Sequence, residues 1–65
     1  MKNLRIAIAD DHPIALLGVR KRIELNQQFC LVGEAVCALS LIELLEQQSA
    51  DVVITDYNMP THSPF

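Results

Sequence analysis

Three short apolar runs alternate with two stretches of helical periodicity along the chain. The runs cover residues 4–9, 29–33 and 51–55, and each has the length of a β-strand. The Val-Val-Ile-Thr segment of the third run is β-branched throughout, and its near-continuous apolar character suits a strand buried on both faces. The small side chains of Ala7 and Ala9 suggest close packing on one face of the first strand.

The first helix is predicted over residues 14–26, with Pro13 at its first position. Proline fits there because an amide at that position would have no acceptor within the helix. Apolar residues recur at intervals of four and form one stripe: Ala15, Val19 and Ile23. We therefore assign the basic run 20–22 to the solvated face of an amphipathic helix in preference to a phosphate-binding patch.

The second helix is predicted to begin near Ser40 and to end at about Gln48. Ser40 and Glu43 have the spacing of a capping box, in which each side chain bonds a backbone amide at the other position. A start one turn earlier is also open, because Ala38 and Leu39 are good helix formers.

The order of these elements is strand, helix, strand, helix, strand. Strands that alternate with helices indicate an α/β fold with a parallel sheet and right-handed crossovers. In doubly wound sheets the ligand site lies beyond the carboxyl ends of the strands, at the switch point between the first and third strands. The pattern alone assigns a fold class and no function.

Composition narrows the possible functions. A 65-residue chain forms one small domain at most, and its net charge of -3 argues against nucleic-acid binding. Cys30 and Cys37 are too few for a disulfide framework and match no zinc spacing, so we expect buried, reduced thiols in a cytosolic protein. No signal peptide is recognisable and no apolar segment approaches the length of a membrane span, so we expect a soluble, intracellular protein.

Three acidic residues follow the strands where this fold places its chemistry. Asp10 and Asp11 come directly after the first strand, and Asp56 comes directly after the third. Carboxylates that leave adjacent strands can converge, and their mutual repulsion favours a bound cation. Oxygen ligands with few thiols or imidazoles nearby suit Mg²⁺ better than zinc. In the alternative interpretation, the acid pair caps the helix and Asp56 begins a turn.

Two segments carry a resemblance to a known family. Ile-Ala-Asp-Asp-His-Pro at 8–13 and Ile-Thr-Asp-Tyr-Asn-Met-Pro at 54–60 resemble the signatures of bacterial response-regulator receiver domains. The Asp-Asp-His-Pro form is similar to the nitrate/nitrite-regulator and capsule-regulator branch, whose members usually carry a LuxR-type DNA-binding output domain. The resemblance implies a flavodoxin-like receiver fold, truncated here to β-α-β-α-β with strand order 2-1-3.

The resemblance also implies a role for each matched residue. Asp56 matches the aspartate that accepts a phosphoryl group from a histidine of a sensor kinase or phosphotransfer protein. Asp11 matches the direct Mg²⁺ ligand, Asp10 the acid that acts through metal-bound water, and Asn58 the residue whose backbone carbonyl completes the protein ligands. Met59-Pro60 matches the turn of the active-site loop. Such a domain is not an enzyme and at most promotes its own phosphorylation.

Other polar residues near these segments have simpler interpretations. His12 falls at helix entry or packs beside the site, although it could instead be a metal ligand. We assign Thr55 to strand packing, Tyr57 to the loop lining and His62 to the solvent-exposed surface.

The family pattern continues beyond the residues present. Residues 1–65 would form part of a receiver domain, with its first three strands and two helices. The resemblance implies that later elements supply a hydroxyl residue, a lysine and a switch aromatic, and that any output domain is absent from this chain. Without those elements the strand at 51–56 is an exposed edge, so we expect self-association through it or through the uncovered sheet face.

Two further functions remain open besides the phosphoacceptor. The first is a truncated interaction module that binds a kinase or another regulator without being phosphorylated. The second is a Mg²⁺-dependent phosphatase, which resembles Asp-x-Asp-x-Thr at its nucleophile. Asn58 and Pro60 stand where that motif requires an acid and a threonine, which disfavours the phosphatase.

Overall fold

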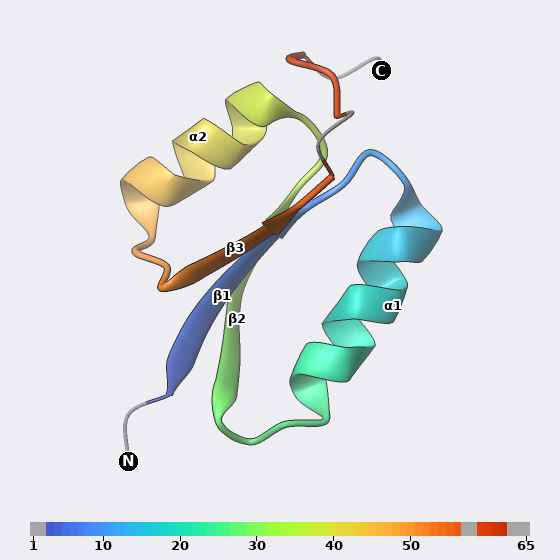
Figure 1. Ribbon diagram of the computed structural model, residues 1–65. Helices are drawn as coiled ribbons and strands as arrows, with labels where there is room; N and C mark the ends of the chain where they lie inside the picture. The colour runs from blue at the N-terminus through green and yellow to red at the C-terminus, as the bar shows by residue number, and fades with distance from the viewer. Residues whose placement is uncertain (1–2, 57–58, 63–65) are drawn as a thin grey trace.

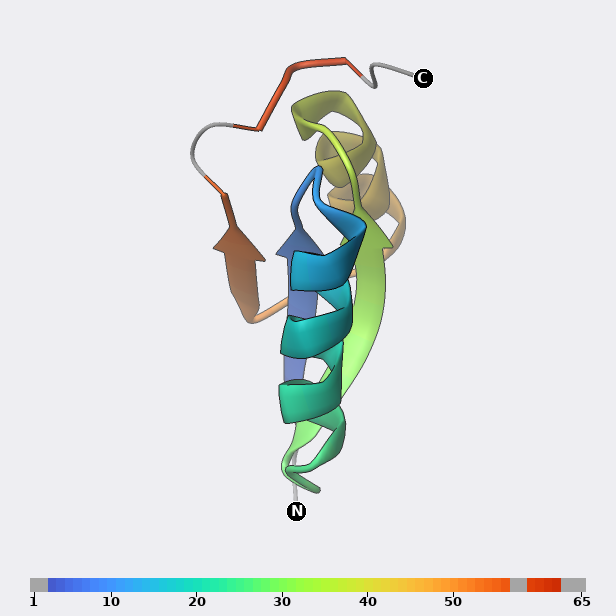
Figure 2. The ribbon, with the colours of Figure 1, turned by 90° about the vertical axis from the view of Figure 1, so that its right-hand side faces the viewer.

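The computed structural model describes residues 3–56 and 59–62 and shows a three-stranded parallel sheet between two helices (Figures 1 and 2). The elements in chain order are β1 (Leu4–Ala9), α1 (Pro13–Glu24), β2 (Phe29–Ala35), α2 (Ala38–Gln47) and β3 (Val52–Thr55). The strand order is β2-β1-β3, with both pairings parallel. The helices lie on opposite faces of the sheet, so the predicted α/β class and 2-1-3 order are confirmed.

The core is aliphatic, in keeping with a chain that has only two phenylalanines, one tyrosine and no tryptophan. It forms around β1 and is made by Ile6, Ile8, Leu16 and Ile23, with Val19 and Leu31 packed against it. The two alanines of β1 are also buried, which confirms the expected close packing there. Both helices pack against β1 and β2, and the central strand is therefore covered on both faces.

Helix α1 begins where the sequence predicts and ends two residues early. Pro13 occupies the first helical position, after an extended residue at His12. At the other end the helix tightens, because the Asn26 amide donates to Ile23 O at 3.1 Å. The Asn26 side-chain oxygen then accepts from the Gln28 amide at 2.9 Å, a local turn that competes with further helix.

Helix α2 begins one turn earlier than Ser40, so the assignment of Ser40 as the N-terminal cap is wrong and the earlier start is correct. Cys37 is the cap and Ser40 is the third helical residue. The Ser40 hydroxyl accepts from the Cys37 amide at 3.2 Å and lies 3.0 Å from the Cys37 carbonyl oxygen. A serine can therefore be the cap of a capping box or its third helical residue. The spacing of Ser40 to Glu43 does not distinguish these two roles.

A loop from the far end of the chain completes the start of α2. The amide of Ala38 donates to Pro60 O, and the amide of Leu39 donates to Thr61 O, both at 2.9 Å. These two amides lack acceptors within the helix, so the loop provides what a local cap usually provides. The red segment beside the start of α2 in Figure 1 is this loop.

Strand β2 is two residues longer than predicted and shifts its register against β1 between Ile6 and Ala7. Beyond the shift, Gly33 lies under the side chain of Leu44 on α2. A Cβ atom added at Gly33 would lie 2.5 Å from Leu44 Cδ1 and 3.2 Å from its Cγ, so the whole leucine side chain would have to move. Glycine is required here by close packing between helix and strand.

We expect Gly33→Ala to lower the free energy of unfolding by about 1–2 kcal/mol, the usual effect of overpacking. Urea denaturation followed by circular dichroism measures it. Gly18→Ala is the matched control, because no atom lies within 4 Å of a Cβ there and alanine is the better helix former. Equal midpoints for the two variants would contradict this account of Gly33.

Strand β3 is exposed, and the expectation that it is buried on both faces is wrong for this chain. All four of its residues are exposed, and neither helix packs against it within the described residues. Its apolar sequence would suit a covered strand, but in the described part of the chain β1 is its only strand neighbour. The predicted exposed edge is therefore present.

Arg5 of β1 secures the beginning of β3. The Arg5 amide donates to Asp51 Oδ2 at 2.9 Å, and the Asp51 amide donates to Arg5 O at 2.8 Å. The guanidinium Nε of Arg5 also donates to Ser49 O at 2.8 Å. These contacts fix the turn between α2 and β3 and hold the start of β3 against β1.

Candidate functional site

Backbone hydrogen bonds hold the acidic residues beyond the carboxyl ends of neighbouring strands. The Asp10 amide donates to Ala35 O of β2 at 3.0 Å, and the Asp56 amide donates to Ala9 O of β1 at 3.2 Å. Each bond continues a strand ladder by one residue. Asp10 and Asp56 therefore leave adjacent strands at the same edge of the sheet.

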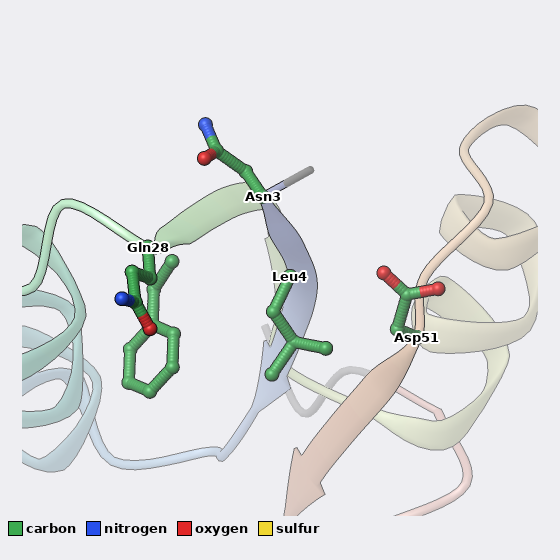
Figure 3. Close-up of a pocket in the computed structure, with 5 residues that line it drawn as sticks. Asn3, Leu4, Gln28 and Asp51 are labelled. Atoms are coloured by element: carbon green, nitrogen blue, oxygen red, sulfur yellow. The ribbon is translucent and has the colours of Figure 1, made fainter. Parts of the chain in front are cut away.

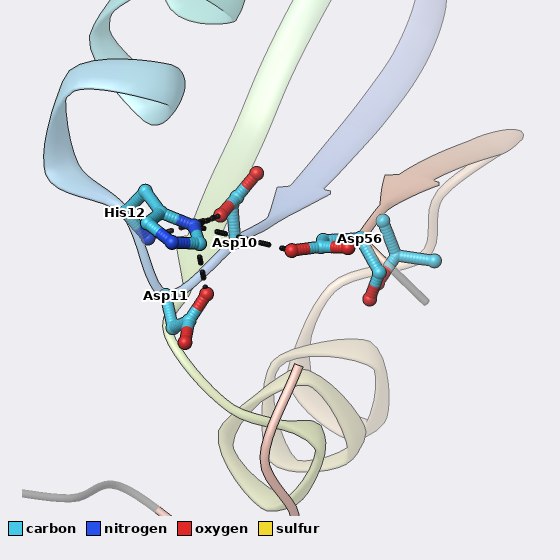
Figure 4. Close-up of polar contacts among 5 residues, drawn as sticks. Asp10, Asp11, His12 and Asp56 are labelled. Atoms are coloured by element: carbon cyan, nitrogen blue, oxygen red, sulfur yellow. Dashed lines mark hydrogen bonds and ion pairs between the residues drawn. The ribbon is translucent and has the colours of Figure 1, made fainter. Parts of the chain in front are cut away.

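Four side chains meet at this edge: Asp10, Asp11, His12 and Asp56 (Figure 4). One ligand-type atom from each lies within 4.8 Å of the others. The carboxylates are partly buried, with side-chain exposures of 23% to 28%. The structure thus brings together the three acids singled out in the sequence and adds an imidazole.

The imidazole of His12 lies among all three carboxylates. Its Nδ1 is 2.8 Å from Asp10 Oδ1, 2.9 Å from Asp11 Oδ1 and 3.9 Å from Asp56 Oδ2. The His12 backbone amide also donates to Asp10 Oδ1, at 3.0 Å. Helix entry and packing beside the site were both open interpretations of this residue. The structure shows both, because His12 precedes Pro13 at the start of α1 and its ring lies against the carboxylates.

These contacts stabilise the charged forms of His12 and Asp10. The hydrogen bond to the Asp10 carboxylate raises the pKa of His12 above its usual value, and the nearby charges of Asp11 and Asp10 add to this. The side-chain and backbone hydrogen bonds from His12 hold the pKa of the Asp10 carboxyl below its usual value. Like charges crowded together would otherwise favour proton uptake.

The donor set fits a small hard cation. Three carboxylates offer the oxygen ligands that Mg²⁺ prefers. Asp11 Oδ1 is buried and accepts no hydrogen bond from the described residues. His12 Nδ1 lies close to it, but this nitrogen can donate only one hydrogen and is also bonded to Asp10. A cleft of about 240 Å³ beside the cluster is lined in part by Asp10 and Asp56.

Other residues singled out in the sequence lie at or around this edge. Asn58 and Tyr57 fall outside the described residues. Thr55 is exposed on β3, and its hydroxyl lies 3.4 Å from the backbone oxygen of Asp56. His62 is exposed, as expected. The Met59 amide donates to Asp56 O at 3.2 Å, which turns the chain away from the strand toward α2.

The remaining features lie away from the cluster. A larger hollow, of about 440 Å³, opens at the other end of the sheet, beside Leu4 and Asp51 (Figure 3). It gathers no group of metal ligands among the described residues. Cys37 is buried and Cys30 half-buried, and both thiols are free. In the part of the chain that the structure describes, no helix has the length and apolar character needed to cross a bilayer.

Comparison with known proteins gives consistent matches over nearly the whole chain. The family model described as "Response regulator receiver domain" matches residues 6–63. Transcriptional regulatory protein RcsB of Escherichia coli K12 is 45% identical over 60 residues, covering 92% of this chain and 28% of that protein. A probable transcriptional regulatory protein NarL of Mycobacterium tuberculosis is 34% identical over 59 residues, covering 91% of this chain and 27% of the relative.

Solved structures agree with these matches. An RcsB response regulator from Salmonella typhimurium superposes with a TM-score of 0.89 at 44% identity, over 94% of this chain and 29% of the other. The isolated receiver domain of RcsB from Salmonella enterica serovar Typhimurium, with the phosphomimetic BeF3⁻, gives a TM-score of 0.86 at 44% identity, over 91% and 43%. The chain thus spans less than a third of the curated relatives, and it belongs to the response regulator receiver domain family.

Proposed function

We propose that this chain is the phosphoacceptor part of a two-component response regulator, and that Asp56 is the residue that accepts the phosphoryl group. The observation that carries the proposal is the convergence of Asp10, Asp11 and Asp56 at the carboxyl edge of the sheet. Asp56 follows β3, the strand next to β1, while the acid pair follows β1 itself. This arrangement separates a nucleophile from the two acids that assist it.

The chemistry follows from these positions. A carboxylate oxygen of Asp56 forms the new bond to phosphorus while the phosphorus–nitrogen bond of a phosphohistidine breaks, and the departing imidazole nitrogen keeps the electron pair. Mg²⁺ held by Asp10, Asp11, Asp56 and the backbone carbonyl of Asn58 would neutralise charge on the transferring group. Asp11 is the direct ligand in this proposal and Asp10 acts through water. The cluster promotes transfer without turning over a substrate of its own.

The partners follow from the family. The phosphoryl donor is a sensor histidine kinase or a histidine phosphotransfer protein, which places the chain in the cytoplasm in our proposal. RcsB has been observed bound to promoter P1flhDC in the presence of phosphomimetic BeF3⁻. Because this chain covers 30% of that protein, any control of DNA binding belongs to a longer parent with an output domain.

Intact mass after incubation with acetyl phosphate and Mg²⁺ tests the proposal. We expect one phosphoryl adduct that requires Mg²⁺ and disappears in Asp56→Asn, because the amide cannot attack phosphorus. Glu46→Gln is the matched control, since it removes one carboxylate charge from an exposed position on α2 and should keep the adduct.

The alternative function predicts a different result. An interaction module that binds a kinase without accepting phosphate would give no adduct even though circular dichroism shows a folded chain. An adduct that persists in Asp56→Asn would contradict the assigned acceptor while leaving phosphorylation itself in place.

We also expect the chain to self-associate through β3 or the sheet face beside it. Val52, Val53 and Ile54 are 37%, 38% and 43% exposed on an edge strand that bears no lysine or proline, and such edges pair readily. Sedimentation velocity at micromolar concentration should show a species larger than the 7.3 kDa monomer. Val53→Lys should shift it toward monomer, whereas Ile42→Lys on α2 should not. A monodisperse wild-type monomer would contradict this expectation.

A further inference from the structure

We propose that His12 is a competitor for the cation site, so that its imidazole must swing away from the carboxylates before Mg²⁺ binds. The inference rests on the proposed function, because it concerns the same carboxylates. It assigns to His12 the role of setting the affinity of the site, which is distinct from being a ligand or a helix cap.

The first argument is that the ring and a cation need the same oxygens. His12 Nδ1 lies 2.8 Å from Asp10 Oδ1 and 2.9 Å from Asp11 Oδ1, with Asp56 Oδ2 at 3.9 Å on the third side. Mg²⁺ approaches carboxylate oxygens to about 2.0–2.1 Å and tolerates little distortion of its octahedron. An N–H group directed at Asp10 Oδ1 repels a cation, and the ring fills part of the space that a cation shared by these oxygens needs.

The second argument is that the imidazole ring can rotate away from the carboxylates. The His12 side chain is 69% exposed, and its side chain makes no capping hydrogen bond to α1. The backbone contact from the His12 amide to Asp10 Oδ1 does not depend on the ring. Rotation of the side chain into solvent therefore costs the contacts to the carboxylates and leaves the main chain in place (Figure 4).

The third argument is that a competitor and a ligand predict opposite effects of removing the imidazole. As a ligand His12 would strengthen cation binding, and its loss would weaken it. As a competitor its loss frees Asp11 Oδ1, the buried oxygen that accepts no hydrogen bond from the described residues, for the cation. The sign of the change in Mg²⁺ affinity therefore identifies the role.

The experiment is a Mg²⁺ titration of the whole chain by isothermal calorimetry, for the wild type, His12→Ala and His12→Asn. Asparagine is a favoured residue at a helix cap, so the second variant keeps α1 intact if alanine does not. His62→Ala is the matched control, because that histidine is exposed and not part of the cluster. We expect both His12 variants to bind Mg²⁺ on the order of 10-fold more tightly, as loss of one or two partly exposed charge contacts implies.

A second readout follows the ring itself. In proton NMR the ring signals of His12 should move as Mg²⁺ is added, whereas those of His62 should stay. Equal or weaker binding by both His12 variants would overturn the competition while leaving the phosphoacceptor proposal standing. Absence of Mg²⁺ binding in all four proteins would overturn both, and the acetyl phosphate experiment would then fail as well.

Discussion

Ile8→Ala is expected to abolish the cooperative fold of this chain. Ile8 is 1% exposed on the middle strand, and truncating such a side chain costs about 2–5 kcal/mol because a cavity remains. A core of this size rarely supplies more than about 3–5 kcal/mol in total. We therefore expect the circular dichroism spectrum of the variant to lose its helical signal without denaturant.

Ile14→Ala is the matched control for that variant. Ile14 is 85% exposed on the first turn of α1, so the same truncation removes little buried surface there. Its free energy of unfolding, measured by urea denaturation, should stay within about 0.5 kcal/mol of the wild-type value. If the two isoleucine variants unfolded at the same urea concentration, the core would not be where the packing places it.

Asp11→Ala is expected to weaken Mg²⁺ binding by about 100-fold or more. Even the removal of groups that only orient metal ligands costs about 10–100-fold in affinity, and Asp11 supplies a ligand oxygen directly in the proposed site. Calorimetric titration measures the change. The chain contains one tyrosine and no tryptophan, so fluorescence of Tyr57, next to Asp56 in the sequence, gives a second readout.

Glu43→Ala serves as the control for Asp11→Ala, because it removes an exposed acid of α2 that is not part of the cluster. Both variants lower the negative charge by one, so a general electrostatic effect would appear equally in each. Unchanged Mg²⁺ affinity in Asp11→Ala would remove Asp11 from the ligand set and would direct attention to Asp10 and Asp56.

The α/β order and the approximate bounds of the five elements could be predicted from the sequence because each rests on a local pattern. Pro13 marks the start of α1, and the β-branched run before Asp56 marks β3. The start of α2 could not be predicted with the same accuracy. It depends on carbonyls of Pro60 and Thr61, which no local pattern around Ser40 contains.

The convergence of the three acids was also expected, since residues after adjacent parallel strands share an edge. Packing of His12 beside the site was one open interpretation. Its contact with all three carboxylates could not be deduced from the sequence, because its side-chain direction depends on the extended backbone before Pro13 and on the carboxylates around it. The burial of β3 was mispredicted for a different reason. The apolar sequence of β3 is suited to neighbouring elements that would cover it, whereas its exposure depends on which neighbouring elements are present.

The loop that caps α2 bears on the order in which the molecule assembles. The amides of Ala38 and Leu39 receive their acceptors from residues that leave the ribosome after β3. The first turn of α2 can therefore be completed only once Pro60 and Thr61 have been synthesised. Movement of residues 59–62 away from α2 would leave both amides without these acceptors, so we expect hydrogen exchange at Ala38 and Leu39 to report on that loop.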